Sequence, residues 1–188
     1  LTCIWVAEKL GDTLYPREII TMRRAPFQAQ MQMLVDVVQR DRASRASIDE
    51  TGMGLPFVEQ AKGLLGKFRI EGVTFTLPTK FALATMLKDR MEDRKFRIPA
   101  GDIYLRDDLH SITKAVTSTG AVRLVHDGES DGHGDRFWAA ALCVNAAGEF
   151  AGPIEVQPLH QLRSGADETM ITTTGFGTVR RRPSGLYF

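Results

Sequence analysis

The feature that most constrains the fold is a regular alternation of helix and strand patterns that follows a single hairpin pattern. Residues 1–10 and 13–25 are rich in strand-forming side chains and flank the turn residues Gly11 and Asp12, which predicts an antiparallel hairpin. Beyond it, segments with helical spacing of apolar residues alternate with short β-rich segments. This order predicts an α/β fold with a mixed sheet that has helices on both faces.

The individual segments are separated by glycine and proline. The clearest helix is 26–41, where apolar side chains recur at Phe27, Met31, Leu34 and Val38 and Pro26 suits a first turn. Further helices are predicted over 55–66, 77–94, 102–117 and 131–148, and further strands over 45–54, 68–76, 95–101 and 121–128. Because glycine and proline break every pattern after Gly148, we expect a domain over 1–163 and an extended tail or arm over 164–188.

Composition excludes several classes of protein. The 188 residues are 43% apolar with a net charge of +1, so any DNA binding must depend on a local basic surface. There is no apolar run of 18 residues and no signal-peptide pattern, so we expect a soluble cytoplasmic protein without a membrane span. Cys3 and Cys143 lie far apart without a CxxC spacing, which predicts buried free thiols.

An acidic cluster precedes the last predicted helix, in DGHGDRFW at residues 131–138. Asp131 is suited to cap the helix N-terminus. Asp135 shares a helical stripe with the apolar residues Trp138 and Leu142, at spacings i, i+3 and i+7. A carboxylate at the edge of a buried face needs a partner, so this stretch predicts a bound cation or metal beside Asp135.

The spacing around this cluster excludes two common metal motifs. Asp127, Glu129 and Asp131 match the first, third and fifth positions of a calcium-binding EF-hand loop, but the twelfth position is Trp138 instead of the required Glu. His133 lacks a second helical histidine of the HExxH type, which disfavours a zinc hydrolase. An oxygen-rich site for a hard cation remains.

A second acidic site lies in SIDETGMG, residues 47–54. Asp49 follows a predicted strand at its carboxyl end, where open α/β sheets place their ligands, and Gly52 and Gly54 allow a sharp turn beside it. The alternative is that Asp49 only hydrogen-bonds its own turn. Together with Asp135 it predicts a Mg²⁺ site suited to phosphodiester hydrolysis, which would need at least one more carboxylate.

Basic residues supply candidate DNA contacts. Lys80 begins a basic stretch that runs to Arg97, but interleaved acidic residues favour a solvated helix face as the alternative. Arg180, Arg181 and Arg182 stand among glycine, proline and aromatic residues, which suits a flexible arm that contacts phosphates, although such runs also occur in tails without that role. We take these three arginines and Lys80 as candidate DNA-binding residues.

Six segments, in order, resemble the nuclease domain of phage terminase large subunits, in particular the type found in Mu-like prophages. They are LTCIWVAEKLGD, APFQAQ, IDETGMG, FT with PTKFALATML, DGHGDRFWAAAL and GFGTVR. The resemblance covers nearly the whole chain. It implies a ribonuclease H-like fold, in which three antiparallel strands precede alternating helices and strands.

The resemblance also implies an activity and a set of metal ligands. Acidic residues from the first strand, the fourth strand and the last helix would bind two Mg²⁺ or Mn²⁺ ions, and the domain would cut concatemeric double-stranded viral DNA during packaging. The fourth-strand acid falls on Asp49 and the last-helix acid on Asp135, with Asp131 and His133 completing or orienting the metal shell. Glu50 is a weaker candidate, because strand alternation points it away from Asp49.

Part of the family pattern falls upstream of Leu1. The resemblance places the first strand and its catalytic Asp there, so we expect a trimmed chain that lacks both and is impaired in activity. It also implies an upstream ATPase domain in the same protein, and the portal protein and the small terminase subunit as partners. Two alternatives stay open: a non-catalytic module that binds DNA or docks to those partners, and another ribonuclease H-like nuclease such as a resolvase or transposase.

Overall fold

The computed structural model describes residues 1–116, 122–126 and 134–148. The chain divides into two units, Leu1–Gly152 and Pro153–Phe188, and all of the described residues belong to the first. The predicted domain boundary after residue 163 and the tail over 164–188 therefore stay predictions. Within the described part, no helix is long and apolar enough to cross a membrane.

The N-terminal hairpin is present as predicted. Strands β1 (Thr2–Leu10) and β2 (Thr13–Met22) pair antiparallel across a turn at Gly11, whose φ of +60° favours glycine. The register shifts between Val6 and Ala7. A shift of this kind marks a β-bulge, which bends the ribbon and increases its twist.

Two helix and strand pairs follow the hairpin, as the sequence predicts. They are α1 (Phe27–Arg40), β3 (Ala46–Asp49), α2 (Gly54–Leu65) and β4 (Ile70–Val73). Strands β3 and β4 pair parallel, and α2 makes the crossover between them. Pro26 was predicted to lie in the first turn of this helix, and it occupies the N-cap of α1, one position before the first helical residue.

The second half of the domain is mostly helical. It contains α3 (Leu77–Glu92), α4 (Ile103–His110), β5 (Ile112–Val116), β6 (Val122–His126) and α5 (Asp135–Ala146). Strands β5 and β6 form an antiparallel hairpin of their own. The predicted strand over 121–128 and the predicted helices over 77–94 and 131–148 are confirmed with shorter bounds.

The prediction of one helix over 102–117 is wrong. The helix ends at His110, and β5 follows immediately. Ile112, Thr113 and Val116 are β-branched, and such side chains favour an extended backbone over a helix. The capping residue Asp102 starts α4 as the pattern indicates, because its Oδ1 accepts a hydrogen bond from the Leu105 N–H at 2.9 Å.

The predicted strand over 95–101 is also wrong, because only one residue of it pairs. Phe96 forms a single bridge with Leu14, flanked by two backbone hydrogen bonds between Leu14 and the neighbours of Phe96. Pro99 has no N–H to donate to a ladder, so pairing cannot continue far along the segment.

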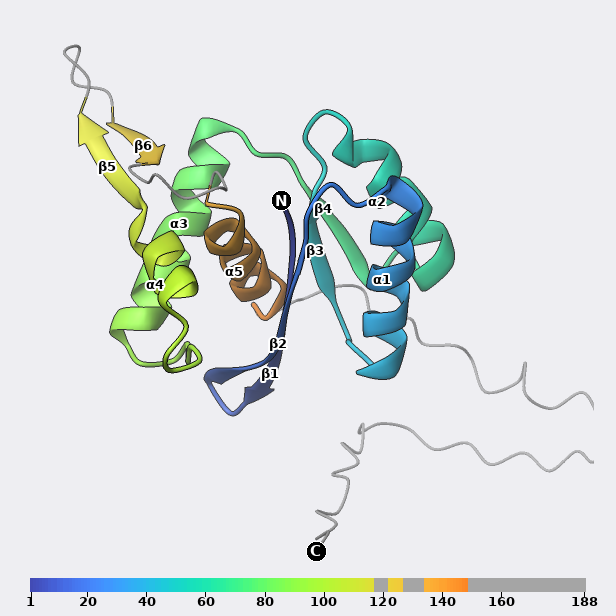
Figure 1. Ribbon diagram of the computed structural model, residues 1–188, viewed down its shortest axis with the longest axis horizontal. Helices are drawn as coiled ribbons and strands as arrows, with labels where there is room; N and C mark the ends of the chain where they lie inside the picture. Colours follow the sequence, from blue (N-terminus) through green and yellow to red (C-terminus); the bar gives the residue numbers. More distant parts are fainter. Residues whose placement is uncertain (117–121, 127–133, 149–188) are drawn as a thin grey trace, which may run out of the picture. The chain divides into compact units, whose positions relative to one another are not determined.

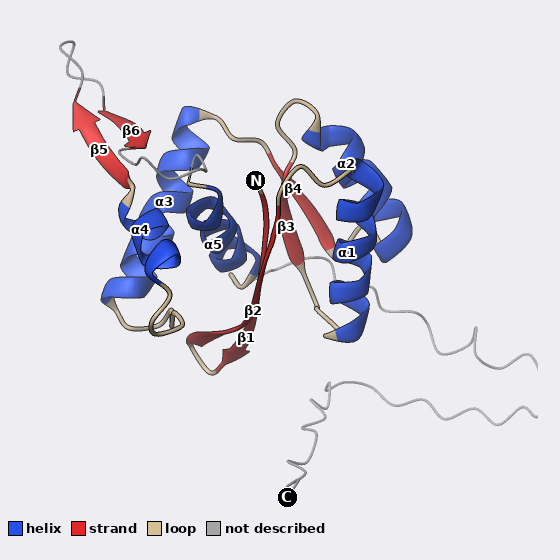
Figure 2. Cartoon of the chain, viewed as in Figure 1, coloured by secondary structure: helices blue, strands red, loops and turns tan. Residues whose placement is uncertain are grey.

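Figure 1 shows how these elements are arranged, and two hydrophobic cores lie among them. One joins the β1–β2 hairpin with α3, α4 and α5, and it includes the fully buried Leu14 and Leu87. The other joins α1 and α2 with β3 and β4, and it includes the fully buried Val58. Figure 2 shows α1 and α2 on one side of β3 and β4 and α5 on the other, so helices cover both faces as predicted.

The strands form three separate two-stranded ladders among the described residues, instead of one continuous sheet. In particular, β1 and β3 belong to different ladders although α5 packs against both of them. The mixed α/β class is confirmed, and the separation of β1 from β3 shapes the site described next.

Candidate active site

A cleft of about 1160 Å³ is lined by residues of β1, β3 and α5, together with residues of α1. Asp49 and Asp135, the two predicted metal ligands within the described part of the chain, both line it, as does Lys80. Asp131, His133, Arg180, Arg181 and Arg182 lie outside the described residues. The fold therefore brings a strand end and a helix start to one cleft, as the sequence predicts.

Asp49 is held by the turn that follows its strand. Its Oδ1 accepts hydrogen bonds from the Thr51 N–H at 2.9 Å and the Thr51 hydroxyl at 2.5 Å. The Thr51 oxygen in turn accepts a hydrogen bond from the Phe75 N–H at 2.8 Å. The hydrogen bond that was predicted between Asp49 and its own turn is therefore present. The other carboxylate oxygen of Asp49, Oδ2, bonds to none of the described residues, so it is available to a ligand.

Two glycines make this turn possible. Gly52 has a φ of +60°, and a Cβ at Gly54 would clash with the backbone carbonyl of Asp49. Glu50 lies apart from the cleft: its Oε1 accepts a hydrogen bond from the Thr74 hydroxyl at 2.8 Å, and its carboxylate covers Gly72. Adjacent carboxylates thus have separate surroundings, as strand alternation predicts.

Asp135 is the first residue of α5, and its side chain is 29% exposed. Trp138 and Leu142 line the same cleft, which confirms the stripe that the helical spacing predicts.

The start of α5 is stabilised by a residue that the sequence did not indicate. The N-cap is Gly134, with a φ of +73° and no side-chain cap. Asp131, the predicted cap, lies outside the described residues. Asp108 of α4, only 2% exposed, accepts a hydrogen bond from the Arg136 N–H at 3.3 Å, and its Oδ2 lies 3.6 Å from the Arg136 guanidinium. An anion at a helix N-terminus offsets the partial positive charge there.

A polar cluster anchors the other end of α5. The Glu71 Oε2 on β4 accepts hydrogen bonds from the Ser47 hydroxyl at 2.8 Å, the Asn145 amide at 2.9 Å and the Arg45 guanidinium at 2.6 Å. Ser47 and Glu71 are ladder partners, and Asn145 is near the end of α5. The cluster therefore fixes α5 against the β3–β4 ladder, and with it the spacing of the cleft walls.

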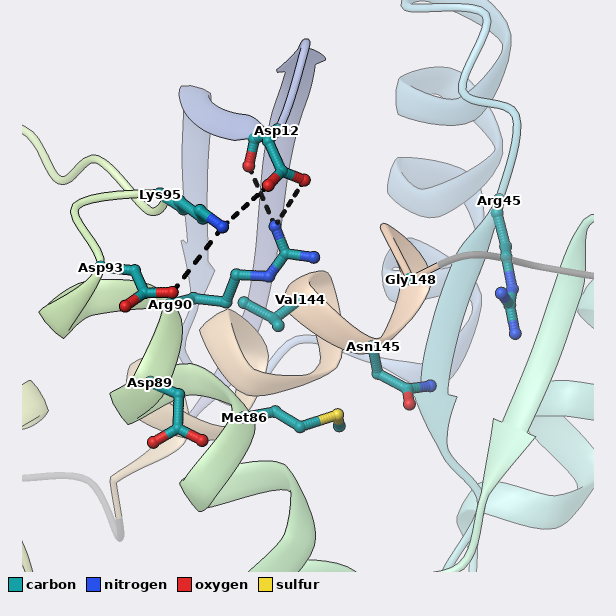
Figure 3. Close-up of a pocket in the computed structure, with 10 residues that line it drawn as sticks. All are labelled: Asp12, Arg45, Met86, Asp89, Arg90, Asp93, Lys95, Val144, Asn145 and Gly148. Atoms are coloured by element: carbon teal, nitrogen blue, oxygen red, sulfur yellow. Dashed lines mark hydrogen bonds and ion pairs between the residues drawn. The ribbon is translucent and has the colours of Figure 1, made fainter.

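A second hollow, of about 510 Å³, lies beside Asn145 (Figure 3). Four of its charged side chains pair with one another: Asp12 lies 2.9 Å from the Lys95 ammonium and 3.6 Å from the Arg90 guanidinium, and Asp93 lies 3.7 Å from Lys95. The bond with Lys95 holds the pKa of Asp12 below its usual value. Because these groups form ion pairs with one another, this hollow is a poor candidate for binding a charged ligand.

Two thiols also line the cleft. Cys3 and Cys143 are free, as predicted, and half-buried. Burial raises the pKa of each to about 12, and the nearby Arg136 guanidinium partly opposes the rise at Cys3. At neutral pH both are protonated, so they act as apolar wall residues instead of metal ligands or nucleophiles.

The donor set of the cleft fits a hard divalent cation. Asp49 and Asp135 offer carboxylate oxygens, and Mg²⁺ commonly binds through one or two carboxylates while retaining waters and substrate phosphate oxygens. No group of three His, Cys, Asp or Glu side chains suited to a metal occurs in residues 1–116, 122–126 and 134–148.

The sequence model of the family described as the terminase RNaseH-like domain matches residues 1–147. This chain belongs to that family. No curated protein matches the sequence. Two similar crystal structures are those of the large terminase nuclease from thermophilic phage G20c with bound cobalt and with bound magnesium.

The likeness to these structures concerns the fold. The sequence identities are 17% and 18% and the TM-scores 0.61 and 0.60, and in both cases the alignment covers 77% of this chain and 80% of the other. The predicted ribonuclease H-like fold of this terminase domain is thus confirmed. The narrower resemblance to the Mu-like prophage type stays a prediction.

Proposed function

We propose that this terminase domain is a metal-dependent endonuclease of a terminase large subunit of the Mu-like prophage type. It cuts concatemeric double-stranded viral DNA during genome packaging, in the cytoplasm of the bacterial host. The observation that carries the proposal is that Asp49 and Asp135, from separate elements, line one cleft and that Asp49 keeps one oxygen unbonded among the described residues. The family match and the magnesium and cobalt bound to the similar nuclease lend support.

The chain's own residues would hold and orient the reacting groups. Asp49 and Asp135 bind Mg²⁺ or Mn²⁺, and Asp131 and His133 complete or orient the metal shell. Two such ions, held by these residues, would supply activation of a water and stabilisation of the leaving oxygen in phosphodiester hydrolysis. The hydrogen bond from Thr51 orients the Asp49 carboxylate before an ion binds. Less conformational entropy is therefore lost when the ion binds.

The remaining partners follow from the same proposal. Arg180, Arg181 and Arg182 contact the DNA backbone, and sequence preference is weak because such contacts do not read bases. The portal protein, the small terminase subunit and an ATPase domain of the same protein act together with this domain during packaging.

The decisive test measures nicking and linearisation of plasmid DNA with Mn²⁺ or Mg²⁺. The assay uses residues 1–188 together with any natural sequence that precedes Leu1. Asp49→Asn and Asp135→Asn are each expected to lower the rate at least about a hundredfold, because each removes a charged ligand. Glu50→Gln is the matched control, since Glu50 adjoins Asp49 but lies outside the cleft. Activity that survives both Asp substitutions rules out this site.

The non-catalytic alternative, a docking module, predicts different results. A docking module would bind portal protein or small subunit equally well with and without Mn²⁺, and calorimetry would detect no Mn²⁺ binding. The terminase family match argues against a resolvase or a transposase.

A further inference from the structure

We propose that Lys80 is the phosphate anchor of the cleft: its ammonium group binds a backbone phosphate of the DNA duplex. This deepens the proposed function and rests on it for the identity of the ligand as DNA. In the absence of bound metal the two carboxylates repel an approaching phosphate, and an uncompensated cation on the cleft wall would offset that repulsion. The described residues offer three basic side chains there, namely Lys9, Arg45 and Lys80.

Two of these three are already engaged. The Lys9 ammonium donates to the carbonyl oxygen of Ala147 at 3.1 Å. The Arg45 guanidinium lies 2.6 Å from the Glu71 carboxylate. Of the basic side chains that line the cleft in the described part of the chain, Lys80 is the one whose charged group has neither a carboxylate nor a carbonyl partner.

Aromatic rings hold the Lys80 ammonium in place. It lies 5.5 Å from the centroid of Phe75 and 5.3 Å from the centroid of Trp138. Those two rings lie 5.3 Å apart at an angle of 55°. Rings attract a cation through their π faces but do not neutralise its charge as a carboxylate would. The ammonium is therefore positioned without losing its attraction for an anion.

The backbone around Lys80 adds to the same field. Helix α3 begins at Leu77 after the cap Thr76, and its first turn contains no acidic residue. Lys80 thus lies near the positive end of a helix dipole, where a lysine lowers helix stability and an anion raises it. Both the side chain and the helix end would be stabilised by a bound phosphate.

The position of Lys80 relates it to both carboxylates. Trp138 is one helical turn after Asp135, and the Phe75 N–H bonds to Thr51, which holds Asp49. The two rings beneath the ammonium therefore adjoin the supports of both metal ligands. A phosphate held by Lys80 would lie in the same cleft as the groups proposed to act on the DNA.

The test compares Lys80→Met with Lys88→Met, using the full chain and a fluorescently labelled duplex in metal-free buffer. Both changes remove one positive charge from α3, but Lys88 lies outside the cleft and its ammonium is 2.7 Å from Glu92. Methionine keeps an apolar chain over the two rings. Fluorescence anisotropy should show about five- to tenfold weaker binding for Lys80→Met and a salt dependence lower by about 0.9, the contribution of one phosphate contact.

Lys80→Arg should restore most of the affinity, since it restores the charge. Equal affinities for Lys80→Met and Lys88→Met, with both variants folded by circular dichroism, would overturn the proposal. Cleavage assays separate it from the nuclease proposal. If Lys80→Met weakens binding while Asp49→Asn and Asp135→Asn still cut, the phosphate site stands and the nuclease site fails. If Asp49→Asn and Asp135→Asn lose cutting while Lys80→Met binds DNA normally, the nuclease site stands and the phosphate site fails.

Discussion

The two carboxylates of the cleft are held in contrasting ways. Asp49 depends on its near neighbours, because Thr51 supplies both hydrogen bonds to its Oδ1 and two glycines shape the turn. Asp135 depends on a distant segment, because the helix that carries it is capped by Asp108 of α4. The contrast teaches that one half of the site is built by a local motif and the other half by packing between helices.

The distinction also separates stability from metal binding. The Asp108 contact is buried, so it should matter chiefly to the folding of α4 against α5. The Thr51 contact is at the surface end of β3, so it should matter chiefly to the orientation of one carboxylate. Three experiments probe this difference.

The largest effect is expected for Asp108→Ala. It leaves the Arg136 guanidinium and the first N–H groups of α5 without their buried anion, so the free energy of unfolding should fall by about 3 kcal/mol. Urea denaturation measures the change. Asp107→Ala is the control, because Asp107 is an exposed neighbour paired with Arg106, and its loss should cost about 0.5 kcal/mol or less. Equal losses would show that the Asp108 contact is not a cap.

A smaller change in stability is expected for Thr51→Val, which keeps the shape of the side chain but removes its hydroxyl. Stability should fall by about 1 kcal/mol. Mn²⁺ affinity, measured by calorimetry, should fall by about tenfold, because the Asp49 carboxylate loses a partner that orients it. Thr51→Ser retains the hydroxyl and should bind nearly as the parent does. Unchanged Mn²⁺ affinity of Thr51→Val would show that Thr51 does not orient the Asp49 carboxylate for metal binding.

The smallest effect concerns the thiols on the Asp135 side of the cleft. Because burial raises the pKa of Cys3 and Cys143 from 9.0 to about 12, the unfolded chain releases these protons first. The stability that burial of the protonated thiols contributes is present below about pH 9 and is lost as the pH rises toward 12. Iodoacetamide labelling at pH 8, followed by mass spectrometry, should be slow at both thiols until urea is added. Rapid labelling of the folded chain at either position would contradict this.

The same contrast explains how much could be predicted from the sequence. The Gly11 turn, the apolar spacing of α1 and the glycines after Asp49 are local signals, and the elements they predict are present. The stripe from Asp135 to Leu142 is likewise a matter of helical periodicity. These features needed no knowledge of the packing.

The features that could not be predicted from the sequence depend on packing between elements. The helix predicted over 102–117 assigned no role to Asp108, and only the packing of α4 on α5 shows it as a cap. The position of Lys80 over Trp138 depends on the contact between α3 and α5. No spacing within one segment encodes contacts between side chains that lie this far apart in the chain.

The separation of β1 from β3 has a consequence for how the sheet can be completed. Each of these strands has a ladder partner along one edge only among the described residues, and both line the same cleft. The backbone N–H and C=O groups along an unpaired strand edge can accept a further strand. A strand that paired with both edges would join the two ladders into one continuous sheet.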